Sequence, residues 1–311
     1  MRRKDDKAER RRSAVTAQRS SLLVSLLLFA CFLSIAFIPA RAAHDLKSAL
    51  LETGRATKVA VNDTSPDTIK IVSYNIRWRG GDDLQKLIGL LRDDAEIGGA
   101  AIIGLQEVDR NKKRTRHTNT AHVMAQDLGM HYAWAAPPQV ESKERKEEET
   151  GVAILSPYPL TDVCRIVLPN KGPGGRRRVA LGTTVKIGET NVRVYSVHAE
   201  TRTSNERRLQ QFQAVLDDLA QHTKTDRAVV LGDFNTIQGD DVRETTRLFT
   251  AASFHTPFPN DEPTWKIFII KLKLDWIWLR GMSVIDYGID RKIGLSDHWP
   301  LWVKLRLNED E

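Results

Sequence analysis

Short runs rich in β-branched residues recur along the chain from Thr68 onward, and few helical patterns separate them. These runs predict strands at 69–76, 100–108, 152–155, 179–187, 192–198, 228–231 and 301–305. At least one more strand is predicted within 268–279. Apolar residues with helical spacing occur at 84–91, 121–128 and 206–220. Because strands arrive in runs instead of alternating with helices, the pattern predicts packed mixed sheets flanked by helices and disfavours a doubly wound parallel sheet.

The first 42 residues have the organisation of a targeting segment. Residues 1–20 are polar and basic, the 17 residues 22–38 are apolar apart from two serines, and residues 40–42 (Ala-Arg-Ala) have the small-x-small form of a signal-peptidase site. This length falls between a typical signal peptide and a membrane span. We therefore predict an N-terminal signal or signal-anchor helix, and the sequence leaves cleavage open. Because a basic flank stays in the cytoplasm, we expect the folded domain to lie outside the cytoplasm. It would then be secreted, periplasmic or anchored in the membrane through residues 22–38.

Charge is unevenly distributed along the chain. The whole sequence carries +7, but residues 1–42 hold nine Lys/Arg against three Asp/Glu, so the remaining 269 residues carry only +1. A domain dedicated to gripping polyanions usually has a clear basic excess, which this part lacks. Of the two cysteines, Cys31 lies in the apolar leader, so Cys164 alone remains and the folded part has neither an internal disulfide nor a cysteine-based zinc site.

Polar residues follow the predicted strands at their C-terminal ends or interrupt apolar runs. They are Asn75, Glu107, His198, Asp233, Asn235, Asp275, Asp297 and His298. Carboxylates and amides are hard oxygen ligands that suit Mg²⁺, Mn²⁺ or Ca²⁺ better than zinc. Two histidines, with a carboxylate to orient one of them, suit acid–base work on water. Together these groups favour metal-assisted attack on a phosphate ester.

Each of these residues, taken singly, also has a structural interpretation. Glu107 can be a strand cap and His198 a hydrogen-bonded structural histidine. Asp233 and Asn235 can form an Asx-turn. Asp275 is more informative because it lies in the apolar run LKLDWIWL (272–279), where a carboxylate is costly to bury without a partner.

Seven sequence blocks, taken in order, carry a family resemblance. They are SYNIRW (73–78), LQEVDR (105–110), GVAILSPYPL (151–160), YSVHAE (195–200), GDFN (232–235), LDWIWL (274–279) and SDHWPL (296–301). Their order resembles the endonuclease/exonuclease/phosphatase superfamily, which includes deoxyribonuclease I-like, exonuclease III-like and sphingomyelinase-like enzymes. The resemblance implies an α/β fold, a four-layer sandwich of two mixed β-sheets flanked by helices. The chain then divides into a leader (1–42), a linker (43–66), a catalytic domain (67–306) and a tail (307–311).

The resemblance also implies a Mg²⁺ or Mn²⁺ site in a cleft at one sheet edge. Glu107 resembles the principal metal ligand, with Asn75 beside it and Asp297 as a second acidic group. The chain departs from the family beside this site. The family often has Gly-Asn-Ala where this chain has Gly-Val-Ala at 151–153, and Thr-His-Leu where it has Val-His-Ala at 197–199. These departures put the substrate in doubt more than the activity.

The remaining polar residues resemble the catalytic groups of the family. Asp233 and Asn235 resemble the pair that aligns the attacking water and the phosphate. His298, oriented by Asp275, resembles the catalytic histidine. His198 resembles the second histidine, which contacts the phosphate or protonates the leaving group.

Two classes of function follow. The first is a divalent-metal-dependent hydrolase of phosphate esters, with no protein partner inferred. We favour a phosphodiesterase acting on a lipid head group or nucleic acid, and the sequence leaves a phosphomonoesterase open. The second is a catalytically silent phosphate-binding domain, which is disfavoured because silent relatives usually lose an acid or histidine position and all are present here. Arg178, in the basic loop 172–178, either binds substrate phosphate or belongs to a solvated loop tip. Trp78 and Trp265 are candidates for the rim of the site.

Overall fold

Two β-sheets form the centre of the fold. The computed structural model describes residues 50–58, 66–139 and 149–307. The larger sheet has seven strands in the order β1 (Leu51–Arg55), β4 (His131–Ala135), β5 (Glu149–Ser156), β3 (Ile102–Arg110), β2 (Thr68–Asn75), β14 (Leu301–Arg306) and β13 (Ser283–Ile289). Strands β2 and β3 are parallel and the other neighbours antiparallel, so the sheet is mixed.

The smaller sheet is also mixed. Its five strands follow the order β12 (Asp275–Arg280), β9 (Arg227–Asp233), β8 (Thr190–His198), β7 (Val179–Ile187) and β6 (Leu160–Val167). Strands β8 and β9 are parallel, and the other neighbours are antiparallel. A separate two-stranded hairpin consists of β10 (Trp265–Ile267) and β11 (Ile270–Leu272).

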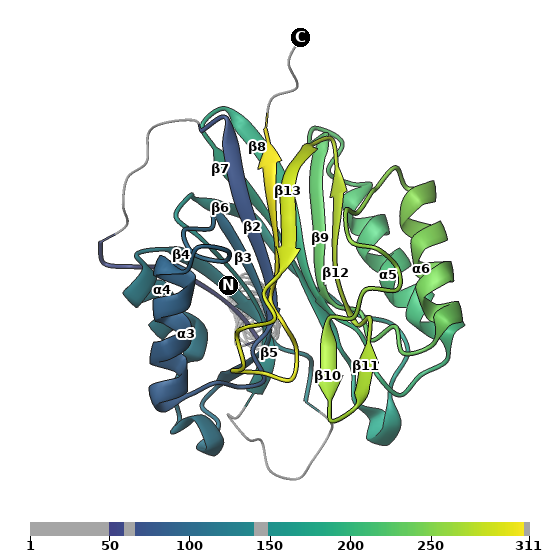
Figure 1. Ribbon diagram of the computed structural model, residues 1–311, viewed down its shortest axis with the longest axis horizontal. Helices are drawn as coiled ribbons and strands as arrows, with labels where there is room; N and C mark the ends of the chain where they lie inside the picture. The colour runs from purple at the N-terminus through teal and green to yellow at the C-terminus, as the bar shows by residue number, and fades with distance from the viewer. Residues whose placement is uncertain (1–49, 59–65, 140–148, 308–311) are drawn as a thin grey trace, which may run out of the picture. The chain divides into compact units, whose positions relative to one another are not determined.

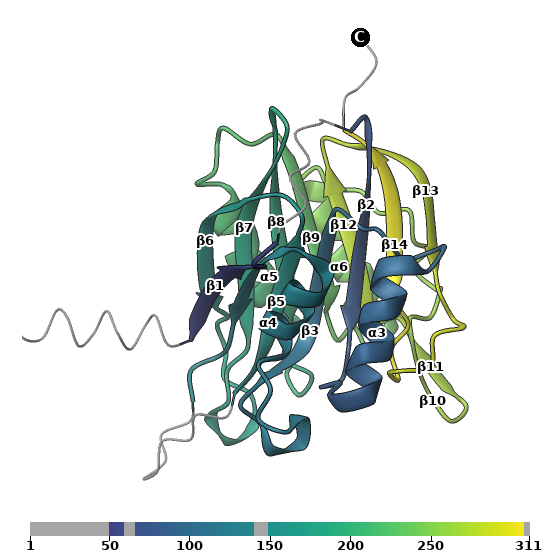
Figure 2. The ribbon, with the colours of Figure 1, turned by 90° about the vertical axis from the view of Figure 1, so that its left-hand side faces the viewer.

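Helices cover the outer face of each large sheet. Figure 1 shows α3 (Gly81–Asp93) and α4 (Thr120–Leu128) on one side and α5 (Asn205–Leu219) and α6 (Gly239–Ala251) on the other, with the sheets between them. Figure 2 looks onto the side of α3 and α4, which lie over strands of the larger sheet. Single-turn 3₁₀ helices occupy Lys113–Thr115 and Pro173–Gly175.

Local sequence signals explain where two of these helices begin or end. The Asn119 side chain accepts a hydrogen bond from the His122 N–H and caps the start of α4, and Gly129 ends that helix with a φ of +69°. The Ser204 side chain accepts from the Arg207 N–H in the same way and caps α5.

Three hydrophobic cores separate the four layers. The core between the sheets includes Ile71, Ile154, Val194, Val229 and Ile277. The core beneath α3 and α4 includes Leu87, Ile103, Met124 and Leu155. The core beneath α5 and α6 includes Phe212, Phe249, Trp276 and Trp278. All three lie within one compact unit, Leu50–Glu311, which therefore contains the apolar packing needed to fold without the leader.

The predicted sandwich of two mixed sheets flanked by helices is confirmed, but its boundaries need correction. Strand β1 lies within 43–66, predicted as a linker, and pairs with β4 at the edge of the larger sheet. Gly54 interrupts its strand pattern because the Tyr132 ring fills the space where a Cβ would lie, 2.5 Å away. At the other end, Leu307 of the predicted tail is buried.

The leader predicted at 1–42, including the apolar run 22–38, lies outside the described residues. Among the helices within 50–58, 66–139 and 149–307, none is both long and apolar enough to cross a membrane.

Candidate active site

Three neighbouring strands of the smaller sheet place three of the predicted residues side by side. His198 ends β8 in register with Asp233, which ends the parallel strand β9. Asp275 begins the antiparallel strand β12, also in register with Asp233. Residues at the same register point to the same face of a sheet. The three buried side chains therefore form a row whose spacing is set by the strands.

The larger sheet contributes Asn75 and the loop before β14. Asn75 ends β2, and its Nδ2 donates a hydrogen bond of 3.0 Å to Asp233 Oδ2, which joins the two sheets. Ser296 Oγ donates to the Asn75 carbonyl oxygen at 2.8 Å. This contact holds the segment 296–298 against the row on the smaller sheet and brings Asp297 and His298 to it.

His298 and Asp275 form a buried pair. His298 Nδ1 lies 2.8 Å from Asp275 Oδ2 and 3.0 Å from Oδ1. Thr264 Oγ1 donates to Asp275 Oδ2 at 2.7 Å and accepts from the Leu274 and Asp275 backbone N–H groups. Because a carboxylate accepts, Nδ1 must carry the proton. The carboxylate therefore fixes the ring so that Nε2 faces Asp233 Oδ2, 3.8 Å away.

Asp233 is the point on which the other side chains converge. Besides Asn75 and His298, its Oδ2 faces His198 Nε2 at 3.6 Å. Its Oδ1 accepts the Asn235 backbone N–H at 3.1 Å, which is the Asx-turn contact that the sequence allowed. Asn235 Nδ2 donates to the Ala199 carbonyl oxygen. The turn thus anchors Asn235 to the end of β8 as well as to Asp233.

Burial and charge set different protonation tendencies for the two histidines. Burial opposes the imidazolium form of His298, but the Asp275 and Asp233 carboxylates outweigh it and raise the pKa of His298. Burial, with the nearby cations Arg178, His298 and Arg176, holds the pKa of His198 well below its usual range. Arg178 Nη1 lies 3.5 Å from His198 Nδ1, so Nδ1 accepts and Nε2 carries the proton. His198 is therefore a neutral donor.

Burial also acts on the central carboxyl group. It raises the pKa of Asp233, and the carboxylates of Asp275 and Glu107 add to the effect. The neighbouring His298 opposes the effect, since an imidazolium favours the Asp233 carboxylate.

A β-bulge directs Glu107 toward the site. The register of β3 against β5 shifts between Gln106 and Val108, and Glu107 at the shift has a φ of +57°. The Glu107 carbonyl oxygen accepts the Trp78 N–H at 3.0 Å, which helps to hold this unfavourable backbone conformation. Bulges re-aim side chains, often next to active sites. Among the described residues, the Glu107 carboxylate has no ion-pair partner.

The residues predicted to bind a divalent metal fit that role chemically. Asp297 lies beside Asn75, with Ser296 Oγ between them, and Arg77 Nη1 pairs with Asp297 Oδ2 at 3.3 Å. The ion pair with Arg77 was not predicted. The half-buried carboxylates of Glu107 and Asp297 and the Asn75 amide offer the hard oxygen donors that Mg²⁺ and Mn²⁺ prefer.

A second group of possible ligands consists of Asp233, Asp275 and His298. Their ligand atoms lie within 4.8 Å of one another. However, His298 Nδ1 and Thr264 already occupy the Asp275 oxygens. We therefore describe this group as a hydrogen-bonded cluster and not as the metal centre.

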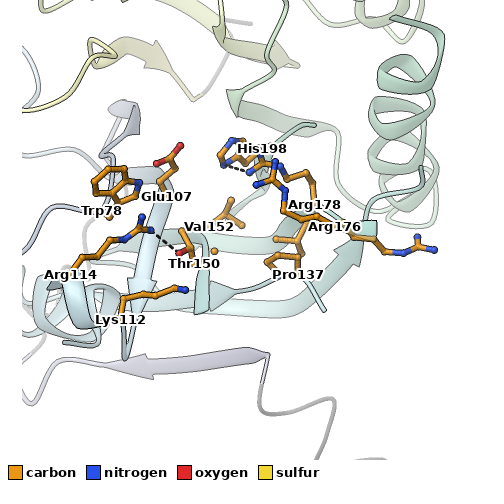
Figure 3. A pocket seen from close by; sticks show the side chains of 13 residues that line it. Trp78, Glu107, Lys112, Arg114, Pro137, Thr150, Val152, Arg176, Arg178 and His198 are labelled. Carbon is orange, nitrogen blue, oxygen red and sulfur yellow. Dashed lines mark hydrogen bonds between the residues drawn. The ribbon is translucent and has the colours of Figure 1, made fainter. Parts of the chain in front are cut away.

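A basic cavity adjoins these residues. It has a volume of about 500 Å³, and both Glu107 and His198 line it. Figure 3 shows Arg114 and Lys112 on one wall and Arg176 and Arg178 on the other. Trp78, predicted as a rim residue, lines it too, and Arg114 stacks on its ring at 4.1 Å. The cavity thus suits a negatively charged ligand next to the cluster.

Several residues of this site escaped the sequence analysis because they act through distant partners. Glu200 is fully buried and pairs with Arg176 at 3.3 Å and Arg178 at 3.2 Å, which orients the basic loop toward His198. Lys112 and Arg114 follow the LQEVDR block, and their positive charge is the one feature of the sequence that could have predicted their place in the site. Thr264 carries no such signal, because its role depends on the fold around Asp275.

Carboxylates and histidines thus converge at one edge of a sandwich of two mixed sheets. The chain belongs to the endonuclease/exonuclease/phosphatase family, whose model matches residues 72–298. Members of this family are phosphoesterases and nucleases, typically dependent on divalent metal. No curated protein matches the chain.

Solved structures confirm the fold. An endonuclease/exonuclease/phosphatase from Beutenbergia cavernae is 17% identical with a TM-score of 0.62, covering 78% of this chain and 72% of that one. The 3′ phosphatase NExo from Neisseria, bound to a product DNA hairpin, is 20% identical with a TM-score of 0.55. The match covers 76% of this chain and 98% of that one. The human Nocturnin catalytic domain, with a bound sulfate anion, is 18% identical with a TM-score of 0.56. The match covers 82% of this chain and 96% of that one.

Proposed function

We propose that this protein is a Mg²⁺- or Mn²⁺-dependent phosphodiesterase. The observation that carries the proposal is the convergence of His198, His298 and Asn75 on Asp233 Oδ2, beside the bulged carboxylate of Glu107. Glu107, Asn75 and Asp297 would hold the metal, which supplies charge neutralisation at the phosphoryl oxygens when bound.

The chain's own groups account for the handling of protons. Asp233 and Asn235 would orient the attacking water, and the Asp233 carboxylate would accept its proton, since burial raises the pKa of that carboxyl and makes it a better base. His298, held by Asp275 in one orientation, would stabilise the charge that develops at the phosphate. His198, a neutral Nε2–H donor, would hydrogen-bond to a phosphoryl oxygen or to the leaving-group oxygen.

The basic cavity supports a substrate with negative charge beyond the scissile phosphate. Five cationic side chains line it: Lys112, Arg114, Arg176, Arg177 and Arg178. A lipid head group and a nucleic acid both offer such charge. Turnover of plasmid DNA, RNA, sphingomyelin and phosphoinositides would decide between these sources. A silent phosphate-binding domain is the competing function, and the complete set of acidic and histidine residues favours activity.

Hydrolysis of bis-p-nitrophenyl phosphate with Mg²⁺, and its loss in EDTA, tests the proposal. Asp233→Asn should abolish the EDTA-sensitive rate, while Asp286→Asn, a matched change at an exposed carboxylate of β13, should not alter it. Phosphate binding without turnover by the wild-type protein would identify the silent domain instead.

We also propose that the domain works outside the cytoplasm. The support is the basic and apolar composition of residues 1–42.

A further inference from the structure

The hairpin of β10 and β11 ends in an exposed apolar tip. Phe268 and Ile269 are 87% and 94% exposed, and Ile267 and Ile270 beside them are 38% and 54% exposed. Figure 1 shows the hairpin as a separate ribbon that extends beyond the neighbouring strands of the smaller sheet. These four residues, 267–270, are called the hairpin tip below. Contiguous exposed apolar residues mark interaction sites because the fold itself gains nothing from them.

The backbone of the tip is also unusual. Tight hairpin turns that need a positive φ normally use Gly, Asn or Asp. Phe268 has a φ of +50°, which is strained for an aromatic residue. Its side chain lies in solvent, so packing does not offset the strain. Such strain persists mainly where function maintains it.

Positive charge flanks the tip on both strands. Lys266 and Lys271 lie directly opposite each other in the register of the hairpin. Like charges at opposed positions destabilise a strand pair in water. In the part of the chain that the structure describes, neither ammonium group has a carboxylate partner. An anionic surface against the hairpin would supply the missing partners.

This arrangement matches a bilayer better than a protein partner. Apolar and aromatic side chains enter the acyl boundary while flanking lysines meet anionic head groups. A second protein chain would need about 800 Å² on each side for a standard interface. Four side chains offer on the order of a few hundred Å².

The hairpin is joined to the active site. The Lys266 N–H donates to the Asp297 carbonyl oxygen at 2.9 Å, and Trp265 pairs with His298 as an isolated bridge. Thr264, just before β10, donates to Asp275. We propose that the hairpin tip inserts into the surface of a bilayer containing anionic phospholipid and so holds the active site at that surface. The inference concerns binding alone and does not depend on the proposed reaction.

Vesicle flotation of a protein lacking residues 1–42 tests this inference without the apolar leader. The compact unit from Leu50 onward contains all three hydrophobic cores, so this protein should fold. Binding to phosphatidylcholine–phosphatidylserine vesicles is expected to fall at least about tenfold for each apolar tip side chain removed. The variants are Ile269→Ser and Phe268→Ser/Ile269→Ser.

A matched control is Ile285→Ser, the same change at a 45%-exposed isoleucine on β13, which should leave binding unchanged. Lys266→Gln/Lys271→Gln should remove the preference for anionic over phosphatidylcholine vesicles. Vesicles should also slow hydrogen exchange at 265–272. Equal binding by the parent and the double tip variant would overturn the inference. A tip-dependent dimer in light scattering, without vesicle binding, would overturn it too and identify self-association. Unchanged melting temperatures would confirm that the variants fold.

Discussion

Asp275 and His298 should act as one catalytic unit, and exchanging the carboxylate for an amide tests this directly. In Asp275→Asn, a single side-chain oxygen must replace two. With that oxygen at the Oδ2 position, it accepts from Thr264 Oγ1 and His298 Nδ1 as before, but the amide N–H₂ takes the Oδ1 position, 3.0 Å from Nδ1. With that oxygen at the Oδ1 position, it accepts from His298 alone, and the Thr264 hydroxyl loses its acceptor. Either arrangement removes the negative charge that raises the pKa of His298 and so weakens the imidazolium form that would stabilise charge at the phosphate.

The size of the effect follows from the contacts. Removing one group that stabilises charge developing in the transition state typically costs about 10²- to 10³-fold in kcat, so His298→Ala should lower kcat by that factor. Asp275→Asn should lower kcat by at least about tenfold but by no more than His298→Ala, because it acts through the histidine. For the same reason, the double variant should be about as slow as His298→Ala alone.

Thr264→Val is the matched control for a purely structural role. Thr264 Oγ1 makes three buried hydrogen bonds, one of them to Asp275, and does not touch His298. Its loss should destabilise the fold by about 1–3 kcal/mol. That corresponds to a fall in Tm of several degrees at roughly 2–4 °C per kcal/mol. Turnover should fall far less than in Asp275→Asn.

The assay measures kcat for bis-p-nitrophenyl phosphate and Tm on both single variants and the double variant. Losses in kcat that multiply independently would show that Asp275 and His298 are not coupled. If Asp275→Asn instead lowered Tm as Thr264→Val does and left kcat intact, Asp275 would be a structural anchor only.

Three further outcomes are expected. Glu107→Gln should weaken Mg²⁺ binding at least about tenfold in calorimetric titration, because the amide keeps its shape but loses the charge that holds a hard cation; unchanged affinity would remove Glu107 from the metal site. Burial lowers the pKa of Lys273 from 10.5 to about 8. Between these two pH values the unfolded chain binds more protons than the folded chain, so the free energy of unfolding should rise with pH, by at most roughly 1.4 kcal/mol per pH unit. Urea unfolding of Lys273→Met should lack that rise, and equal slopes in both proteins would contradict the assignment. A phosphatase topology reporter fused after Glu311 should be active, whereas a fusion that works only in the cytoplasm would contradict the predicted location.

Local patterns in the sequence determined the strands that carry the site. The β-branched runs predicted at 69–76, 179–187 and 192–198 correspond closely to β2, β7 and β8, because strand periodicity and side-chain branching act within a few residues. The ends of these strands, with Asn75 and His198, were therefore visible from the sequence. So was Asp275, because a carboxylate within an apolar run requires a buried partner.

Other parts of the chain gave weak local signals. Strand β1 was missed because Gly54 and the charged residues of LETGR do not alternate, and the edge of a sheet tolerates such a sequence. The helix α6 was also not predicted. Its apolar face is short, with Val242 and Phe249 buried, and its position depends on packing against the smaller sheet.

Tertiary structure alone decided what each polar residue touches. Pairing of strands far apart in the sequence places His198 and Asp275 on either side of Asp233, and no local pattern encodes that register. The bulge that turns Glu107 toward the cavity arises from a mismatch between β3 and β5. Burial and neighbouring charge exist only in the folded chain. Burial lowers the pKa of both histidines, but carboxylates outweigh it at His298, whereas cations add to it at His198. The chemistry of the residues was thus readable in the sequence, whereas their partners depend on long-range contacts that form only when the two sheets pack.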